Sequence, residues 1–311
     1  MNDLNESGYT TMKTQQSLQT PATLRRLLDQ ESLNFILTNR LPRVALTHFM
    51  GWLSKIEHPW VCRPAIAIWK MFADLDLSEA ARQDFKSLHD CFTRALKPGA
   101  RPFNPDPTLL CSPSDGIIVG CGPIVDETLI QAKGLTYTLT DLIHDPARVD
   151  QHRNGFYVTL RLKSSMYHRF HAPADCRVSQ VDYISGDVWN VNPPALKRVP
   201  GLYCRNERAV IRAQLADGSP MTLVPVAAIL VASIRLHWLD VRLHLRYRGA
   251  NPIPCDAALA RGEEMGWFEH GSTIIICLPP GYGLAEDLGL GAQVQAGQAL
   301  AQPEKPKKHK L

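Results

Sequence analysis

The chain has 311 residues, of which 45% are hydrophobic and 21% are charged, and its net charge is +4. This composition is typical of a folded globular protein and excludes a largely disordered chain. The net charge is small, and the densest basic run is confined to the tail at 305–310. A nucleic-acid-binding protein more often has a basic face throughout, so we expect no nucleic-acid partner.

Residues 1–20 are polar and lack the apolar core of a signal peptide, which predicts a disordered tail. From residue 21 to residue 97 the pattern is helical. Phe49, Trp52, Trp60 and Trp69 stand near cations. That combination suits helices lying in a membrane interface, with the alternative of a helical layer packed on the rest of the protein. Prolines break the stretch into several short helices, and a further helix is predicted from Ser78 through the segment that ends at Leu96.

The proline-rich segment 98–107 predicts a linker and a domain boundary. Beyond it, from 108 to 311, short apolar runs alternate with Gly, Pro, Asn and Asp turns, as in a β-rich domain. The longest apolar run, 223–234, is too short to span a bilayer and contains Pro225, so we interpret it as a buried strand. The predicted fold is therefore α+β: an N-terminal amphipathic helical region followed by a β-rich domain of barrel or sandwich character.

The eight cysteines form no CxxC pair and no cluster with histidine at zinc spacing. This pattern predicts free thiols in a reducing compartment and no bound metal. With no signal peptide and no membrane span expected, we predict a protein that is cytosolic or attached to a membrane face.

Three segments contain residues suited to acid–base chemistry. Ser272 follows Gly271 at the entry to an apolar strand, Asp115 lies in a Ser-Asp-Gly turn, and His168 and His171 are three residues apart. Each has a structural alternative, since Asp-Gly is a common turn and a serine can simply begin a strand. The two histidines would share a helix face or point to opposite sides of a strand. Together, a serine, a histidine and an aspartate are the parts of an activated nucleophile.

A fourth segment places Arg205 and Arg208 just before a predicted strand. The structural interpretation is a solvated charge run at a turn. The functional interpretation is a clamp for an anion, because the guanidinium group presents a planar fork of donors.

The order of these motifs resembles the phosphatidylserine decarboxylase proenzyme family. The resemblance extends from about residue 75 to 301 and includes LIQAKG (129–134), SGDVWNVN (185–192), VPGLYCRNERAVI (199–211) and GEEMGWF (262–268). The N-terminal part also resembles the bacterial members. One departure stands beside the expected cleavage site, where His270 replaces the usual apolar or small residue.

The resemblance implies self-cleavage between Gly271 and Ser272, giving a β chain of residues 1–271 and an α chain of residues 272–311. Ser272 would become a covalent pyruvoyl group, the only cofactor. Asp115, His171 and Ser272 match the self-processing triad, and His168 matches the histidine of the decarboxylation step. Arg205 or Arg208 is a candidate to bind the substrate.

The implied activity is that of a carboxy-lyase which converts phosphatidylserine to phosphatidylethanolamine. The enzyme would lie peripherally on the cytoplasmic face of the cell membrane, as an α–β heterodimer that could dimerise further. The alternatives are a pyruvoyl decarboxylase of another amino-acid headgroup and an uncleaved, non-catalytic membrane-bound homologue. A serine hydrolase is disfavoured because the chain lacks a GxSxG elbow.

Overall fold

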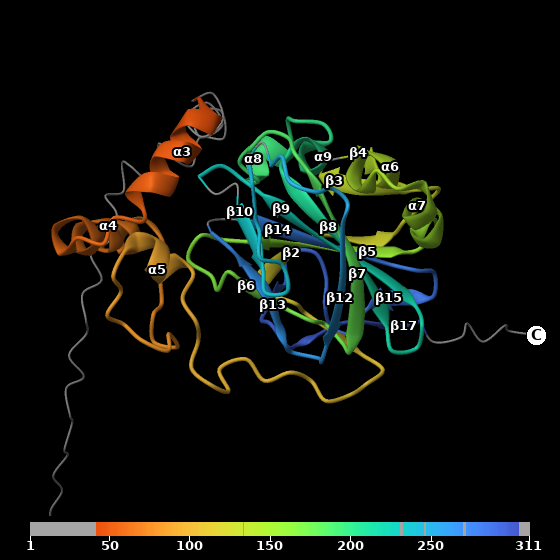
Figure 1. The fold of residues 1–311 in the computed structure, drawn as a ribbon. Helices are drawn as coiled ribbons and strands as arrows, with labels where there is room; N and C mark the ends of the chain where they lie inside the picture. Colours follow the sequence, from red (N-terminus) through yellow and green to blue (C-terminus); the bar gives the residue numbers. More distant parts are fainter. Residues whose placement is uncertain (1–41, 133, 231–232, 246, 270–271, 305–311) are drawn as a thin grey trace, which may run out of the picture.

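A computed structural model describes residues 42–132, 134–230, 233–245, 247–269 and 272–304. The predicted tail 1–20, the first part of the predicted helical region and the basic tail at 305–310 lie outside the described residues. Helices α3 (Arg43–Leu53), α4 (Pro59–Phe72) and α5 (Leu88–Phe92) form a group at one side of a β-rich body (Figure 1). Pro59 occupies the first turn of α4, where a missing N–H costs nothing, so α3 and α4 are separate short helices, as predicted.

The helix predicted from Ser78 to Leu96 is wrong over most of its length, because only α5 is helical there. Local polar contacts take the place of the helix: Asp76 accepts hydrogen bonds from the backbone and hydroxyl of Ser78. Phe85 then packs against a small core that includes Leu77 and Cys91. Tertiary contacts with these side chains override the helical periodicity.

The body is built on an eight-stranded antiparallel sheet in the order β12–β7–β8–β9–β14–β5–β2–β16. Its strands are β2 (Gly116–Pro123), β5 (Phe156–Leu162), β7 (Cys176–Ile184), β8 (Arg208–Leu215), β9 (Pro220–Ala227), β12 (Ile253–Leu259), β14 (Ser272–Leu278) and β16 (Gln293–Val294). The apolar runs at 116–122, 155–162, 176–184, 209–215 and 272–278 are thus strands, as their sequences predict.

A four-stranded sheet packs over one face of this large sheet, in the order β11 (Arg242–His244), β10 (Ser233–Leu236), β13 (Glu264–Phe268) and β6 (Arg169–His171). The main core lies between the two sheets and contains Leu160, Phe170 and Phe268. A second core lies on the other face of the large sheet, beneath helices α6 (Leu139–Ile143), α7 (Pro146–His152), α8 (Pro193–Leu196) and α9 (Leu202–Arg205).

Two smaller sheets complete the described body. Strands β1 (Leu110–Cys111), β17 (Ala299–Pro303) and β15 (Tyr282–Leu284) form one, and β3 (Thr128–Ala132) with β4 (Leu135–Thr138) forms the other. The mixed α+β class is confirmed. The arrangement has the sandwich character that was predicted, but its sheets are open and do not close into a barrel.

The apolar run 223–234 is not one strand, as the sequence predicted. Its first part belongs to β9 in the large sheet and its last residues belong to β10 in the four-stranded sheet. Leu230, between them, has a φ of 73°, a left-handed conformation that is unfavourable for a side chain of this size. The run is apolar because β9 contributes to the cores on both faces of the large sheet and β10 contributes to the main core.

Strand β13 constrains the chain just before Ser272, and Gly266 is a position where it tolerates no side chain. A Cβ atom added there would lie 1.9 Å from the carbonyl oxygen of Arg235 on β10. We expect Gly266→Ala to lower the free energy of unfolding by about 2 kcal/mol, measured by denaturant titration. Gly51→Ala is the control, since no atom lies within 4 Å of the added Cβ and alanine favours the helix. Equal stability of the two variants would contradict this account of the close approach.

Candidate functional site

Ser272 is the first residue of β14, a central strand of the large sheet. Its backbone pairs with Leu162 of β5 on one side and with Ala227 of β9 on the other. Gly271 and His270, which complete the predicted cleavage site, lie outside the described residues. The position of Ser272 is therefore set by two neighbouring strands.

A cavity of about 890 Å³ lies at this end of the sheet. Leu162 and the following residues 163–167 line it, and so does the segment 228–230 that follows Ala227. The chain segments that follow Leu162 and Ala227, the two strand partners of Ser272, thus form part of the cavity wall. The remaining walls come from the helical group and from the proline-rich segment, through Phe72, Phe92 and Arg101.

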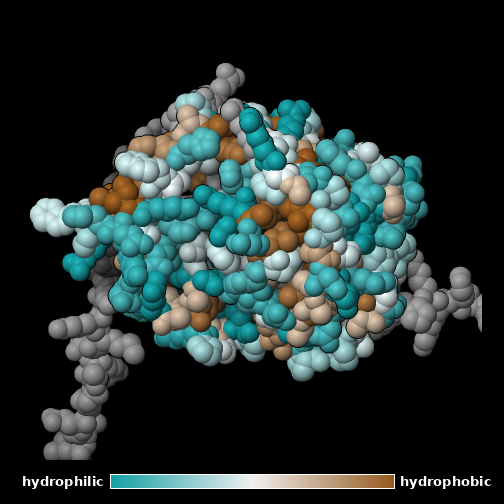
Figure 2. Space-filling model, in the orientation of Figure 1, coloured by the Kyte–Doolittle hydropathy of each residue, from teal (hydrophilic) through white to brown (hydrophobic). Residues whose placement is uncertain are grey.

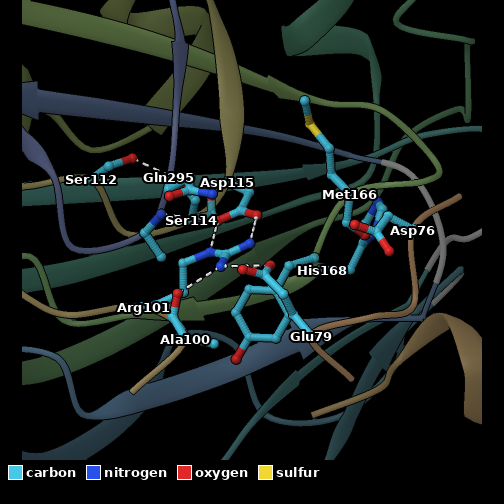
Figure 3. Close-up of polar contacts among 12 residues, drawn as sticks. Asp76, Glu79, Ala100, Arg101, Ser112, Ser114, Asp115, Met166, His168 and Gln295 are labelled. Carbon is cyan, nitrogen blue, oxygen red and sulfur yellow. Dashed lines mark hydrogen bonds and ion pairs between the residues drawn. The ribbon is translucent and has the colours of Figure 1, made fainter. Parts of the chain in front are cut away.

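Asp115 lines the same cavity, just before β2, and is nearly buried. Its two carboxylate oxygens each accept a hydrogen bond from Arg101, through Nε and Nη2, both at 2.7 Å. The backbone N–H of Ala296 donates a third bond at 3.0 Å. Figure 3 shows the Arg101 guanidinium between Asp115 and Glu79, to which it also donates. This bidentate geometry fixes the orientation of the carboxylate.

His171, on β6, has both ring nitrogens engaged. Nδ1 lies 2.9 Å from the carbonyl oxygen of Gly262, and Nε2 lies 3.0 Å from the hydroxyl of Tyr167. A carbonyl only accepts, so Nδ1 bears the proton and the neutral ring has its lone pair on Nε2, where the Tyr167 hydroxyl donates. Burial lowers the pKa of His171, outweighing the hydrogen bond to Gly262, which raises it. The neutral, proton-accepting form therefore predominates at neutral pH.

His168 precedes β6 and is fully buried. Its Nδ1 donates to the carbonyl of Met166 at 2.8 Å, so the neutral ring has its lone pair on Nε2. The ring lies 4.0 Å, centroid to centroid, from Phe92, which lines the cavity. His168 and His171 thus occupy different environments, and of the two only His171 lies within β6.

The structure brings Asp115 and His171 to the same region without joining them by a hydrogen bond. Arg101 and Ala296 are the described donors to Asp115, and the carbonyl of Gly262 orients the imidazole in the way predicted for a carboxylate. Tyr167 connects the two, since it lines the cavity beside Asp115 and its hydroxyl contacts His171. The triad of Asp115, His171 and Ser272 stays a prediction.

Arg208 and Arg205 lie away from this cavity wall. Arg208 is buried, and its guanidinium donates to four backbone carbonyls, those of Leu142, Cys204, Asn206 and Asp141. These bonds tie α6 and α9 to the start of β8, which is a structural role. Arg205 is exposed at the end of α9. The geometry therefore offers no support for binding of substrate by either residue in the cavity.

Three site residues were missed by sequence reasoning. Arg101 and Phe103 come from the segment interpreted as a linker, and Tyr167 directly precedes His168. The ring of Phe103 is tilted against that of His171, with ring centroids 5.5 Å apart. A cation in a proline-rich loop gives no local signal of its partner, so only the tertiary fold identifies Arg101.

Two observations concern a possible cofactor or metal. Within the ranges that the structure describes, no group of three or more His, Cys, Asp or Glu side chains is arranged to hold a metal ion. A covalent cofactor formed from Ser272 itself would lie where β5 and β9 lead into the cavity. The cavity has room for a small polar headgroup.

The chain is similar in sequence to known proteins of one family. The family model described as phosphatidylserine decarboxylase matches residues 88–302. A phosphatidylserine decarboxylase proenzyme of Haemophilus influenzae is 35% identical over 274 residues, covering 84% of this chain and 93% of the relative. Proenzymes of the same name from Xylella fastidiosa and Polaromonas naphthalenivorans are 36% and 37% identical, covering 86% and 84% of this chain and 94% and 93% of their own lengths. The chain therefore belongs to the phosphatidylserine decarboxylase family.

Proposed function

We propose that this chain cleaves itself between Gly271 and Ser272 and then decarboxylates phosphatidylserine to phosphatidylethanolamine at a membrane surface. Membership of the family supports the reaction. The observation that supports the site is the start of β14, where both strand partners of Ser272 lead into a cavity that Asp115 also lines.

Self-processing needs a base, because the serine hydroxyl is a poor nucleophile at neutral pH. His171 is the candidate: its Nε2 is the basic nitrogen, and its lowered pKa keeps it neutral. Burial also raises the pKa of Tyr167, so that hydroxyl stays protonated and can pass a proton between the cavity and His171. The charged Asp115, which Arg101 fixes in place, would favour the imidazolium as it forms.

In the proposed cleavage, the Ser272 oxygen attacks the Gly271 carbonyl carbon, and the amide C–N bond gives way to an ester. Removal of the Ser272 α-proton then expels the Gly271 carboxylate and leaves an enamine at residue 272. Its imine tautomer adds water and releases ammonia, which leaves the ketone of the pyruvoyl group. Gly271 has no side chain to obstruct the approach. The products would be a β chain of residues 1–271 and an α chain of residues 272–311.

The pyruvoyl group would supply a carbonyl that condenses with the substrate amine and accepts the electrons released when carbon dioxide leaves. The protein's own task is then to return a proton to the substrate carbon. His168 is the candidate donor once its Nε2 has taken up a proton, because it is buried beside the cavity-lining Phe92 and its Nδ1 is held by Met166.

The helical group is equipped to contact a lipid surface. Trp60 is 85% exposed and Trp52 is 64% exposed, and Phe49, Ile68 and Phe72 are also among the exposed apolar side chains of α3 and α4. Hydrophobic side chains reach the surface around these helices, at the left of Figure 2. Helices of this kind bind bilayers by inserting rings at the headgroup level. Phe72 also lines the cavity, so a lipid lying against α4 would have its headgroup near the site.

No helix in the described part of the chain has the length and hydropathy needed to cross a bilayer. We propose peripheral attachment at the cytoplasmic face of the cell membrane. Arg63 and Lys70 are exposed on α4 and would favour anionic lipids.

Ser272→Ala should remain a single chain of 311 residues, because it lacks the attacking oxygen, while the wild-type protein should separate into residues 1–271 and a pyruvoyl-blocked 272–311. The measurement is the intact mass after incubation with anionic phospholipid vesicles, so that any need for a membrane is met. Ser219→Ala, in the turn between β8 and β9, should process like wild type. An uncleaved wild-type chain would support the non-catalytic homologue instead.

His171 should govern the pH dependence of self-processing. Because its pKa is lowered below the ordinary value of 6.5, the neutral base persists as pH falls and is lost only below that value. The rate, followed by gel densitometry, should therefore reach its half-maximum below pH 6.5. His171→Ala should slow processing by about 100-fold or more, whereas His244→Gln, exposed on β11, should not. A half-maximum above pH 6.5 would show that another group is the base.

Replacing Trp52 and Trp60 together by serine should weaken binding to anionic vesicles by about 100-fold or more, since each ring contributes about 1.5–3 kcal/mol when buried in lipid. Vesicle sedimentation measures the binding. Leu290→Ser removes an equally exposed apolar side chain away from α3 and α4 and should leave binding unchanged. Equal loss in both variants would indicate that the helical group has no special part in membrane contact.

A further inference from the structure

Arg161 is a cation in the cavity wall whose charge is not neutralised by any described carboxylate. It lies on β5, half-buried, beside the Ser272 partner Leu162. Its Nε atom is buried, and no described residue accepts a hydrogen bond from it. Burial lowers the pKa of Arg161, as expected for a guanidinium removed from water. Partial burial of an arginine without a hydrogen-bond acceptor or a counter-charge lowers the stability of the fold unless an anion binds to it.

The other arginines that line the cavity are already engaged. Arg94 donates to the backbone carbonyls of Cys91, Ser165 and Met166. Arg101 is paired with Asp115 and Glu79. Of these three lining arginines, Arg161 is the one whose described surroundings provide no acceptor, so its surroundings differ from those of a purely structural arginine.

Two buried hydroxyl groups near Arg161 also lack a hydrogen-bond partner among the described residues. Thr273 is fully buried and pairs directly with Arg161 across β14 and β5, so the two side chains project from the same face of the sheet. Tyr203 is buried as well: burial raises the pKa of its hydroxyl, and the charge of Arg161 opposes that rise. Of the three, Arg161 lines the cavity, whereas Thr273 and Tyr203 are buried next to it. The half-buried guanidinium is therefore the donor that an oxyanion in the cavity would meet.

We propose that Arg161, with Thr273 and Tyr203 as its buried neighbours, binds the phosphodiester of the lipid headgroup. This inference rests on the proposed function, since it identifies the part of the proposed substrate that the cavity holds. Thr273 follows Ser272 directly, and the substrate phosphate is only a few bonds from the reacting amine. Arginine also matches the geometry of phosphate oxygens through its fork of donors.

The substrate has a second oxyanion, its carboxylate, and the chemistry argues against Arg161 as its partner. The carboxylate loses its charge as carbon dioxide leaves, so a guanidinium bound to it would stabilise the ground state and oppose the reaction. The phosphodiester keeps its charge throughout. Binding the phosphodiester therefore holds the substrate equally in the ground state and the transition state.

Uniform binding of this kind predicts a particular kinetic pattern. With dihexanoyl phosphatidylserine below its micelle concentration, Arg161→Gln should raise KM about tenfold or more and change kcat less than threefold. Arg161→Lys should lie between Arg161→Gln and wild type. Arg177→Gln, an exposed arginine on β7, is the matched control and should keep the wild-type KM. Self-cleavage and thermal unfolding of each variant establish that it folds. A wild-type KM for a folded, cleaved Arg161→Gln would overturn the proposal.

Competition distinguishes the two oxyanions. Glycerophosphoethanolamine has the amine and phosphodiester without the carboxylate, and its inhibition constant should rise about tenfold or more in Arg161→Gln. L-Serine has the carboxylate without the phosphate, and its inhibition should be unchanged. Loss of serine inhibition alone would assign Arg161 to the carboxylate and contradict the proposal.

A binding measurement separates this inference from the proposed function. The uncleaved Ser272→Ala protein, with and without Arg161→Gln, is titrated with glycerophosphoethanolamine and observed by ³¹P NMR. Binding that depends on Arg161 supports the subsite even if the wild-type protein proves inactive. Equal binding by both proteins would overturn the subsite, whereas an inactive, uncleaved wild-type chain would overturn only the proposed function.

Discussion

The pairing of β14 on both of its edges is the constraint on which the rest of the site depends. β9 and β5 hydrogen-bond to it along nearly its whole length, starting at Ser272 itself. An edge strand could shift in register, but a central strand of an antiparallel sheet is fixed by two sets of hydrogen bonds and by side chains in cores on both faces. The first residue of β14 is therefore placed precisely relative to the ends of β5 and β9, and those ends form the cavity wall.

The electrostatics of the site are set by residues outside the predicted catalytic group. Arg101 fixes Asp115 through two hydrogen bonds, and the carbonyl of Gly262 selects the tautomer of His171. Because the Asp115 carboxylate is already satisfied, its influence on His171 operates through space and is weaker than that of a direct hydrogen bond. The His171 imidazole is oriented by the Gly262 carbonyl and by Tyr167. The Asp115 carboxylate acts on it only through a longer-range electrostatic interaction.

Strand positions, the α+β class and the family could be predicted from the sequence, because alternating apolar runs and ordered motifs are local signals. Three features could not. The segment after Ser78 has helical periodicity, but contacts of Phe85 with a small core determine its shape. The linker looks featureless, yet it places Arg101 against Asp115. In the sequence, Arg161 is one cation in an ordinary strand. Only the tertiary structure shows that it lines a cavity and that no described residue accepts a hydrogen bond from its Nε.

Glu269 gives the segment just before Gly271 an anchor of its own. Its carboxylate accepts from Arg242 of β11 and lies within ion-pair distance of Lys55 and His89, which come from the helical group. In the sequence, the proposed cleavage site therefore follows a residue held by ion pairs and precedes a strand held by sheet pairing. Cleavage there would create a new carboxylate two residues beyond Glu269, whose own carboxylate is bound by Arg242 and Lys55. The severed ends would keep their separate attachments, so the cut would release neither chain.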